Sequence, residues 1–319
     1  MGNKTGYGVV IEDVQPRLGV RLKRELKRNK ILYLMAIPVI LYFAIFCYGP
    51  MIGLTIAFKD YQVAKGIFGS SWVGFKYFIE FFQSVYFKRV MTNTLLISVY
   101  TLLFSFPAPI IFALLLNEMG GKYIKKSVQT ISYLPHFISM VVVCGMITDF
   151  FSTNGVITRF ITFFGGEKMN YLGVAKYFRK IYVVTNIWET IGWESIIFFA
   201  ALSGINQELY EAATIDGAKR FQQVLHITLP GIASTIIVML IMRVGQLLNI
   251  GYEKIILLYS PATYETADVI SSLVYRYGIE QGSRYGYSTA VGLFQSVVNL
   301  ILLLVTNAIS RKISDVGLF

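Results

Sequence analysis

The sequence predicts an all-α integral membrane protein with six membrane-spanning helices. Of its 319 residues, 55% are hydrophobic and 15% are charged, whereas an ordinary soluble domain carries about 25% charged residues. The mean hydropathy is +0.58, and the apolar residues are gathered in long runs instead of the stripes that soluble helices and strands show. This composition argues against a soluble globular enzyme and indicates the lipid bilayer as the solvent.

Six runs are long enough to cross the hydrocarbon layer, which takes about 20 residues of helix. Four contain no Asp, Glu, Lys or Arg and cover residues 31–58, 91–117, 127–148 and 285–310. The other two are interrupted: residues 181–207 contain Glu189 and Glu194, and residues 227–252 contain Arg243. We therefore expect a transmembrane domain over residues 31–312, a basic segment over 1–30 before it, and a tail over 313–319 after it.

The basic residues predict which side of the membrane the termini face. Seven of them fall between residues 17 and 30, namely Arg17, Arg21, Lys23, Arg24, Lys27, Arg28 and Lys30. By the positive-inside rule this segment is cytoplasmic, and six spans return the C-terminus to the cytoplasm. The net charge of +11 is then explained by membrane flanks, so we expect contact with membrane lipid and no binding of nucleic acid.

A polar stretch over residues 203–230 connects the fourth and fifth predicted spans on the cytoplasmic side. It looks like two short helices about a glycine hinge, because its alanines favour helix, Gly217 permits a sharp turn and Pro230 precedes the next span. Such an element can dock on a partner. A solvated amphipathic connector is the alternative interpretation.

Within this stretch, Glu-Ala-Ala-x-x-Asp-Gly-Ala at 211–218 is followed by Ile-Thr-Leu-Pro at 227–230. The combination resembles the permease family of ATP-driven importers that work with a solute-binding protein, in particular the carbohydrate branch related to the maltose permeases. The resemblance implies a type I importer permease fold, in which this loop is a coupling helix seated in a cleft of the cytoplasmic ATPase. The implied coupling residues are Glu211, Ala212, Ala213, Asp216, Gly217 and Ala218.

The resemblance further implies a permease subunit of a sugar or oligosaccharide importer in a prokaryotic cell membrane. Its implied partners are a second, non-identical permease, two ATPase subunits that bind ATP and Mg, and an extracellular or periplasmic solute-binding protein. The chain itself shows no Gly-x-x-x-x-Gly-Lys-Ser/Thr phosphate loop, so we expect neither an enzyme nor a bound cofactor. His136 and His226 are far apart in sequence without paired ligands, so no metal site is expected.

Polar side chains inside the predicted spans are the candidates for a substrate pathway, because lipid penalises them unless they face protein or a wet cavity. Asn186, Glu189 and Trp193 share one face of the fourth span at i, i+3, i+7. They combine hydrogen-bonding groups with an aromatic plate, which suits a sugar. The other candidates form one pair on each of the last two spans: Arg243 with Gln246, and Gln295 with Asn299.

Two alternatives remain compatible with these residues. The intramembrane charges can simply pair between helices, and the amides can simply join helices together. A different class of function is a proton-coupled secondary transporter with Glu189 and Glu194 as its proton relay, which would need no ATPase. For an importer, Arg243 and the basic residues on the outer side favour an acidic saccharide, such as a uronic-acid oligomer, as the cargo.

Overall fold

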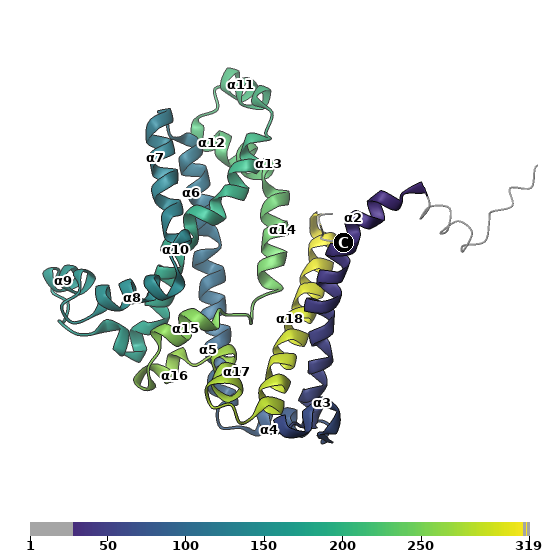
Figure 1. Ribbon diagram of the computed structural model, residues 1–319. Helices are drawn as coiled ribbons and strands as arrows, with labels where there is room; N and C mark the ends of the chain where they lie inside the picture. The colour runs from purple at the N-terminus through teal and green to yellow at the C-terminus, as the bar shows by residue number, and fades with distance from the viewer. Residues whose placement is uncertain (1–27, 315–316, 318–319) are drawn as a thin grey trace, which may run out of the picture. The chain divides into compact units, whose positions relative to one another are not determined.

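The computed structural model describes residues 28–314 and residue 317, and over these ranges the protein is built almost entirely of helices (Figure 1). This confirms the predicted all-α class. The chain divides into two compact units, Met1–Thr55 and Ile56–Phe319. Most of the predicted basic segment over 1–30 and of the predicted tail over 313–319 lies outside the described residues, so these boundaries stay predictions.

The first predicted span is one helical run. Helix α2 (Lys30–Tyr42) continues into the π-helix η1 (Phe43–Tyr48) and the 3-10 helix η2 (Gly49–Phe58). Together they give an apolar run, Lys30–Phe58, that is long enough to cross a membrane. Pro38 lies inside α2, and membrane helices tolerate such a proline because local changes of helix type satisfy the freed backbone groups.

The second span consists of α5 (Phe87–Tyr100), the π-helix η4 (Thr101–Ser105) and α6 (Pro107–Glu118). Pro107 has no N–H to donate back into the helix. The chain accommodates it through the wider turn of η4, in which the Phe106 N–H donates to the Thr101 carbonyl at 3.2 Å. The resulting run, Phe87–Glu118, can cross a membrane and contains the predicted range 91–117.

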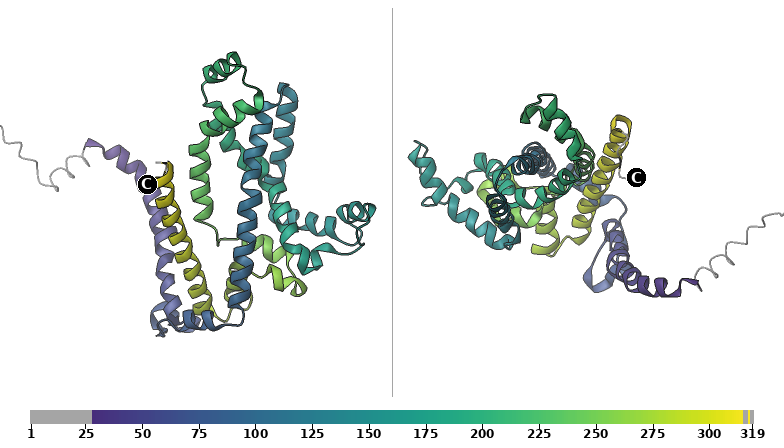
Figure 2. Two further views of the ribbon diagram at one scale, coloured as in Figure 1. Left: turned by 180° about the vertical axis from the view of Figure 1, so that it is seen from behind. Right: turned by 90° about the horizontal axis from the view of Figure 1, so that it is seen from above.

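The prediction of a single helix over residues 127–148 is wrong. Helix α7 (Lys122–Tyr133) gives way to the short η5 (Leu134–Phe137), and the chain restarts as α8 (Met140–Phe151) and α9 (Val156–Phe163). Pro135 explains the break, because its ring and missing N–H end a helix. α7 runs beside α6, whereas α8 and α9 project sideways (Figures 1 and 2). The run that is apolar and long enough to cross a membrane is Met140–Phe163.

Helix α10 (Ala175–Ser203) follows the short η6 (Tyr171–Gly173) and contains most of the predicted fourth span. Its 29 residues reach roughly 43 Å. Gly192 lets α7 come close, because a Cβ at this position would overlap the Ser132 carbonyl of α7. α10 therefore packs lengthwise against α6 and α7 and forms the centre of the second unit.

The fifth span is shorter and more bent than predicted for residues 227–252. After α11 (Gln207–Ile215), the chain forms α12 (Arg220–Gln223), η7 (Val224–Thr228), α13 (Leu229–Gly231) and α14 (Ala233–Val244). The run Arg220–Gly231 meets α14 at 60°. Residues 245–251, which the prediction placed inside the span, form turns and irregular backbone.

The connection between α14 and the last span folds into a layer of short helices. These are α15 (Tyr252–Leu258), η8 (Pro261–Thr263), α16 (Tyr264–Ala267), α17 (Ile270–Tyr275) and η9 (Arg276–Glu280), and the long α18 (Tyr285–Ser314) ends the described chain. The same end of the unit holds the antiparallel pair of β1 (Lys59–Asp60) and β2 (Ser71–Trp72), with η3 (Val63–Lys65) and α3 (Gly66–Gly69) between them, and α4 (Lys76–Gln83).

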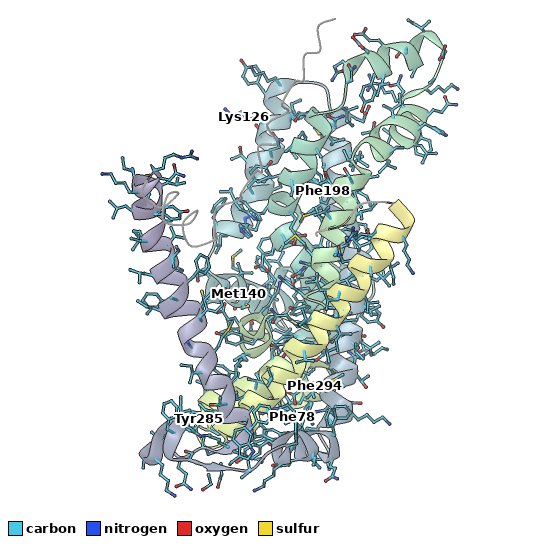
Figure 3. All side chains as sticks on the ribbon, turned by 90° about the vertical axis from the view of Figure 1, so that its right-hand side faces the viewer. Phe78, Lys126, Met140, Phe198, Tyr285 and Phe294 are labelled. Atoms are coloured by element: carbon cyan, nitrogen blue, oxygen red, sulfur yellow. The ribbon has the colours of Figure 1, made fainter. Side chains whose placement is uncertain are left out.

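Aromatic packing joins α4 to the start of α18. The Phe81 and Phe294 rings lie 5.6 Å apart, centroid to centroid, and Phe81 is buried. Figure 3 shows Phe78, Tyr285 and Phe294 gathered at this end of the molecule. The Phe81–Phe294 contact fixes the start of α18 on α4.

By length and composition, four helical runs in the described residues can cross a membrane, or five if the bent pair Arg220–Gly231 and α14 counts as one. α10 carries the remaining predicted span, 181–207. Its glutamates and amide make it less apolar than the others, although it is long enough to span.

Candidate functional site

The loop over residues 203–230 forms two short helices about a glycine, as predicted. The Asn206 side chain caps α11 by accepting a hydrogen bond from the Glu208 N–H at 3.0 Å. At the other end, Gly217 has φ +79°, a left-handed conformation that glycine adopts without strain. The Ala218 N–H then donates back to the Ala213 carbonyl at 2.8 Å, which closes the end of α11.

Side-chain hydrogen bonds tie the two helices of this loop together. Gln223 Nε2 donates to Thr214 Oγ1 at 3.0 Å and to the Ala218 carbonyl at 3.3 Å, across the glycine turn. The Tyr210 hydroxyl lies 3.0 Å from Thr228 Oγ1 and connects α11 to η7. These contacts connect α11 to the start of the fifth span.

The loop presents a mixed polar and apolar surface. Of the predicted coupling residues, Glu211, Ala212, Asp216 and Gly217 are exposed, and Ala213 and Ala218 are half-buried. Four large apolar side chains beside them are also exposed: Leu209, Ile215, Phe221 and Leu225, of which Ile215 is 87% exposed. A cluster of this kind on a projecting loop is typical of a protein interface. Sequence reasoning overlooked these four, although Ile215 lies only two residues before the hinge glycine.

Three of the seven predicted pathway residues meet at one cavity. A cavity of about 150 Å³ is lined by Asn186 of α10, by Arg243 of α14 and by Gln246, which follows α14. The Nδ2 of Asn186 is buried and makes no hydrogen bond with the described residues. A neighbouring cavity of about 180 Å³ is also lined by Arg243 and Gln246, with Glu194 on its wall. The arrangement offers hydrogen-bond donors and one cation to a polar ligand.

The two glutamates of α10 both form ion pairs. Glu189 Oε2 lies 2.7 Å from Lys254 Nζ, with side chains that are 12% and 4% exposed. Glu194 Oε1 lies 3.5 Å from Arg243 Nη1. Sequence reasoning missed Lys254 because it falls just after the predicted fifth span; the available signal was a single lysine inside the apolar stretch of α15. Neither carboxylate is the unpaired acid that a proton relay would use.

Trp193, Gln295 and Asn299 do not line either cavity. The Trp193 ring stacks on His136 at 4.5 Å and 8°. Gln295 and Asn299 both bond to the backbone of Leu248, in the irregular segment after α14. The shared helical face of Asn186, Glu189 and Trp193 is real, but each of the three side chains has a different neighbour.

A buried carboxylate organises the layer of short helices. Asp268 is fully buried and accepts hydrogen bonds from Arg89 at 2.6 Å, Arg276 at 2.9 Å and Ser272 at 2.9 Å. Burial alone would lower the pKa of Arg276, but the hydrogen bond to Asp268, the negative charge of that carboxylate and the neighbouring Tyr259 and Tyr264 together outweigh burial and raise that pKa above its ordinary value. The guanidinium therefore stays charged, and Asp268 connects α5 to α17 and η9.

A helical membrane protein with a projecting polar loop between its spans and a polar cavity at a broken helix has the architecture of a transport subunit. Residues 105–315 match the family model described as "Binding-protein-dependent transport system inner membrane component". The match covers well over half of the chain, so the chain belongs to this family.

Curated relatives and solved structures agree with the family. The chain is 48% identical to protein LplB of Bacillus subtilis over 302 residues, covering 94% of this chain and 95% of LplB. It is 43% identical over 300 residues to the polygalacturonan/rhamnogalacturonan transport system permease YteP of the same species, covering 94% and 93%.

Two solved structures of a bacterial alginate ABC transporter are similar to this chain. One superposes with a TM-score of 0.85 at 47% identity, covering 92% of this chain and 99% of that one. In the other, the transporter is in complex with an alginate pentasaccharide-bound periplasmic protein, and its TM-score is 0.86 at 46% identity, with 93% and 100% covered. The protein thus has the type I permease fold and is the permease of a binding-protein-dependent sugar or oligosaccharide ABC importer, an inner membrane component and not an enzyme.

Proposed function

We propose that this permease imports an acidic oligosaccharide, and that Arg243 attracts its carboxylates. The supporting observation is the position of this arginine, which lines both cavities. Glu194 engages one of its nitrogens at 3.5 Å, and a guanidinium carries five N–H donors. Two similar proteins point to the same chemistry, because one is named for polygalacturonan and rhamnogalacturonan transport and the other for alginate, an acidic polysaccharide.

We further propose that a second, non-identical permease completes the pathway. The two cavities measure about 150 Å³ and 180 Å³, whereas ligand pockets usually span roughly 300–1,000 Å³. A partner subunit facing the cavities would enlarge them to fit an oligosaccharide. An external solute-binding protein would deliver the cargo, by analogy with the similar alginate transporter that is in complex with its pentasaccharide-bound periplasmic protein.

Two ATPase subunits, with ATP and Mg bound to them, are the proposed energy source. The loop at 211–218 would be the docking element for one of them, because it projects from the unit (Figure 1), is tied to α12 by a hydrogen bond from Gln223 to Thr214, and exposes Ile215. Nucleotide-driven closure of the ATPases would move this loop and bias the permease between inward-facing and outward-facing states.

In this proposal both termini lie in the cytoplasm. The C-terminal end of α18 carries Arg311 and Lys312 in its last turn and lies in the half of the second unit that contains α11 (Figure 1). Arg28 and Lys30 stand at the start of the first span. Basic residues at both ends agree with the positive-inside rule.

The test of the cargo compares uptake of a trigalacturonate with uptake of a neutral oligosaccharide of the same length. We expect Arg243→Gln to lower trigalacturonate uptake about tenfold, the loss of roughly one charged hydrogen bond, and Arg243→Lys to retain most of it. Because Arg243→Gln leaves Glu194 without its partner, Arg243→Gln combined with Glu194→Gln is the matched control. The proposal would be contradicted if the importer took up only the neutral sugar and Arg243→Gln did not change that uptake.

A further inference from the structure

The backbone between α14 and α15 leaves helical geometry beside the cavity. The N–H groups of Gln246, Leu247 and Asn249 donate three residues back, at 3.2, 3.1 and 2.8 Å, so the chain runs as successive turns. We call residues 245–251 the unwound segment. Its residues Gln246, Leu247, Asn249, Ile250 and Gly251 form much of the cavity lining.

Leu248, at the centre of the unwound segment, is held by two amide side chains of α18. The Leu248 N–H donates to Asn299 Oδ1 at 3.0 Å, and Gln295 Nε2 donates to the Leu248 carbonyl at 2.7 Å. Gln295 and Asn299 are one helical turn apart, on one face of α18. Leu248 is 1% exposed, and buried backbone groups left without partners are strongly destabilising.

Further contacts hold the unwound segment on both sides of Leu248. Ser98 of α5 donates to the Leu247 carbonyl, and Ser271 of α17 donates to the Ile250 carbonyl at 2.8 Å. At its start, Gly245 lies so close to α18 that an added Cβ would come within 2.5 Å of Leu303 Cδ1. The segment is thus fixed by three helices, and Leu248 is the point at which both backbone groups are bound.

We propose that Gln295 and Asn299 are positioning residues, which act on the cargo only by holding the unwound segment so that Gln246 and Asn249 face the cavity. This inference rests on the proposed function in one respect, namely that the cavity belongs to the transport pathway. It differs from the expectation that these two amides touch the substrate, because one polar atom of each amide is already hydrogen-bonded to the Leu248 backbone.

The two amides have opposite hydrogen-bonding roles, and this makes the proposal testable. Asn299 serves as an acceptor, so an aspartate keeps the required oxygen. Gln295 serves as a donor, so a glutamate loses the donor and places its oxygens against the Leu248 carbonyl. Asn299→Asp should therefore retain the positioned segment, whereas Asn299→Leu, Gln295→Leu and Gln295→Glu should all release it.

The first experiment needs no cargo. In the complete importer carrying Cys47→Ser and Cys144→Ala, Leu248→Cys introduces a thiol whose labelling by a water-soluble maleimide is timed. We expect slow labelling that becomes at least about tenfold faster with Asn299→Leu, once the released segment exposes residue 248. Asn299→Asp should leave the labelling rate within twofold of the rate without it. Equal rates in all variants, with normal assembly of the complex, would overturn the proposal.

The second experiment measures KM and Vmax of trigalacturonate uptake in the same complex without the cysteine. We expect Asn299→Leu and Gln295→Leu each to raise KM about tenfold, roughly the value of one hydrogen bond. The double variant should be little worse, since both act through one residue, and Ser296→Ala on the exposed face of α18 should have no effect. If the KM increases of the two single variants multiplied in the double variant, this would indicate direct contact with cargo and overturn the proposal.

The two experiments separate the inference from the proposed cargo. If the wild-type importer takes up no trigalacturonate, the acidic cargo is wrong, and the labelling rates still decide whether Gln295 and Asn299 hold the unwound segment. If trigalacturonate is imported but neither the labelling rate nor KM responds to the leucine variants, the cargo stands and the positioning role is wrong.

Discussion

Breaking the buried ion pair between Lys254 and Glu189 should destabilise the permease far more than it alters transport chemistry. The nitrogen and oxygen lie 2.7 Å apart, and the side chains are 4% and 12% exposed. The lysine also lies over the Tyr182 ring at 5.4 Å. Removing one partner of a buried pair leaves an uncompensated charge and costs about 3–5 kcal/mol. Glu189→Gln and Lys254→Met should each have an effect of this size.

The double variant distinguishes stability from function. Replacing both charges, with Glu189→Gln and Lys254→Met together, removes the unpaired charge, and such replacements are often close to neutral. The assay is thermal unfolding of the detergent-purified importer. For a chain of 319 residues roughly 1.5 °C accompanies each kcal/mol, so each single variant should lower the midpoint by about 4–7 °C and the double variant by much less. Glu253→Gln, an exposed neighbour on α15, is the control.

A different outcome would refute this reasoning. If Glu189→Gln left the unfolding midpoint unchanged and abolished uptake, the carboxylate would be acting in transport itself, as a proton relay would require. If the double variant were as unstable as either single variant, the pair would not be the source of the effect.

Two further predictions concern packing and the layer of short helices. Gly192→Ala should destabilise the contact between α10 and α7 by about 1–3 kcal/mol, because the added methyl overlaps the Ser132 carbonyl. Size-exclusion recovery of the heated protein measures this, with Gly145→Ala, which meets open space, as the control. Asp268→Asn should lower stability by about 3 kcal/mol, because Arg89 and Arg276 lose a fully buried carboxylate; unchanged protease resistance of the layer of short helices would contradict it.

Much of the fold follows from the sequence because the bilayer imposes a simple rule, a long apolar run for each span. That rule located the first, second and last spans closely. It failed at residues 127–148, where Pro135 lies at the break and the stretch before it contains uncharged polar residues such as Gln129 and Thr130, and at 245–251, where bonds from distant helices replace helical ones. The criterion of a long run with few charged residues contains no information about either event.

The candidate site was predicted only in part, because local patterns place residues on a helix or loop but do not reveal partners that are distant in sequence. Helical spacing correctly places Asn186, Glu189 and Trp193 on related faces, but it does not reveal that Lys254, 65 residues away, neutralises the glutamate. The motif at 211–218 located the projecting loop, and its two-helix form follows from alanines and a glycine. The apolar residues around that motif, such as Ile215, carry no motif of their own and emerge only as exposed side chains.

Docking of the loop at 211–218 on an ATPase is the central claim, and co-purification tests it most directly. The tagged permease is expressed with its genomic neighbours, extracted in mild detergent and analysed by quantitative mass spectrometry. We expect an ATPase and a second permease in stoichiometric amounts, with the ATPase lost and the permease retained on Glu211→Lys, and neither lost on Glu167→Lys, an exposed residue between α9 and η6. A homo-oligomer without ATPase, or ATPase recovery unaffected by Glu211→Lys, would contradict it.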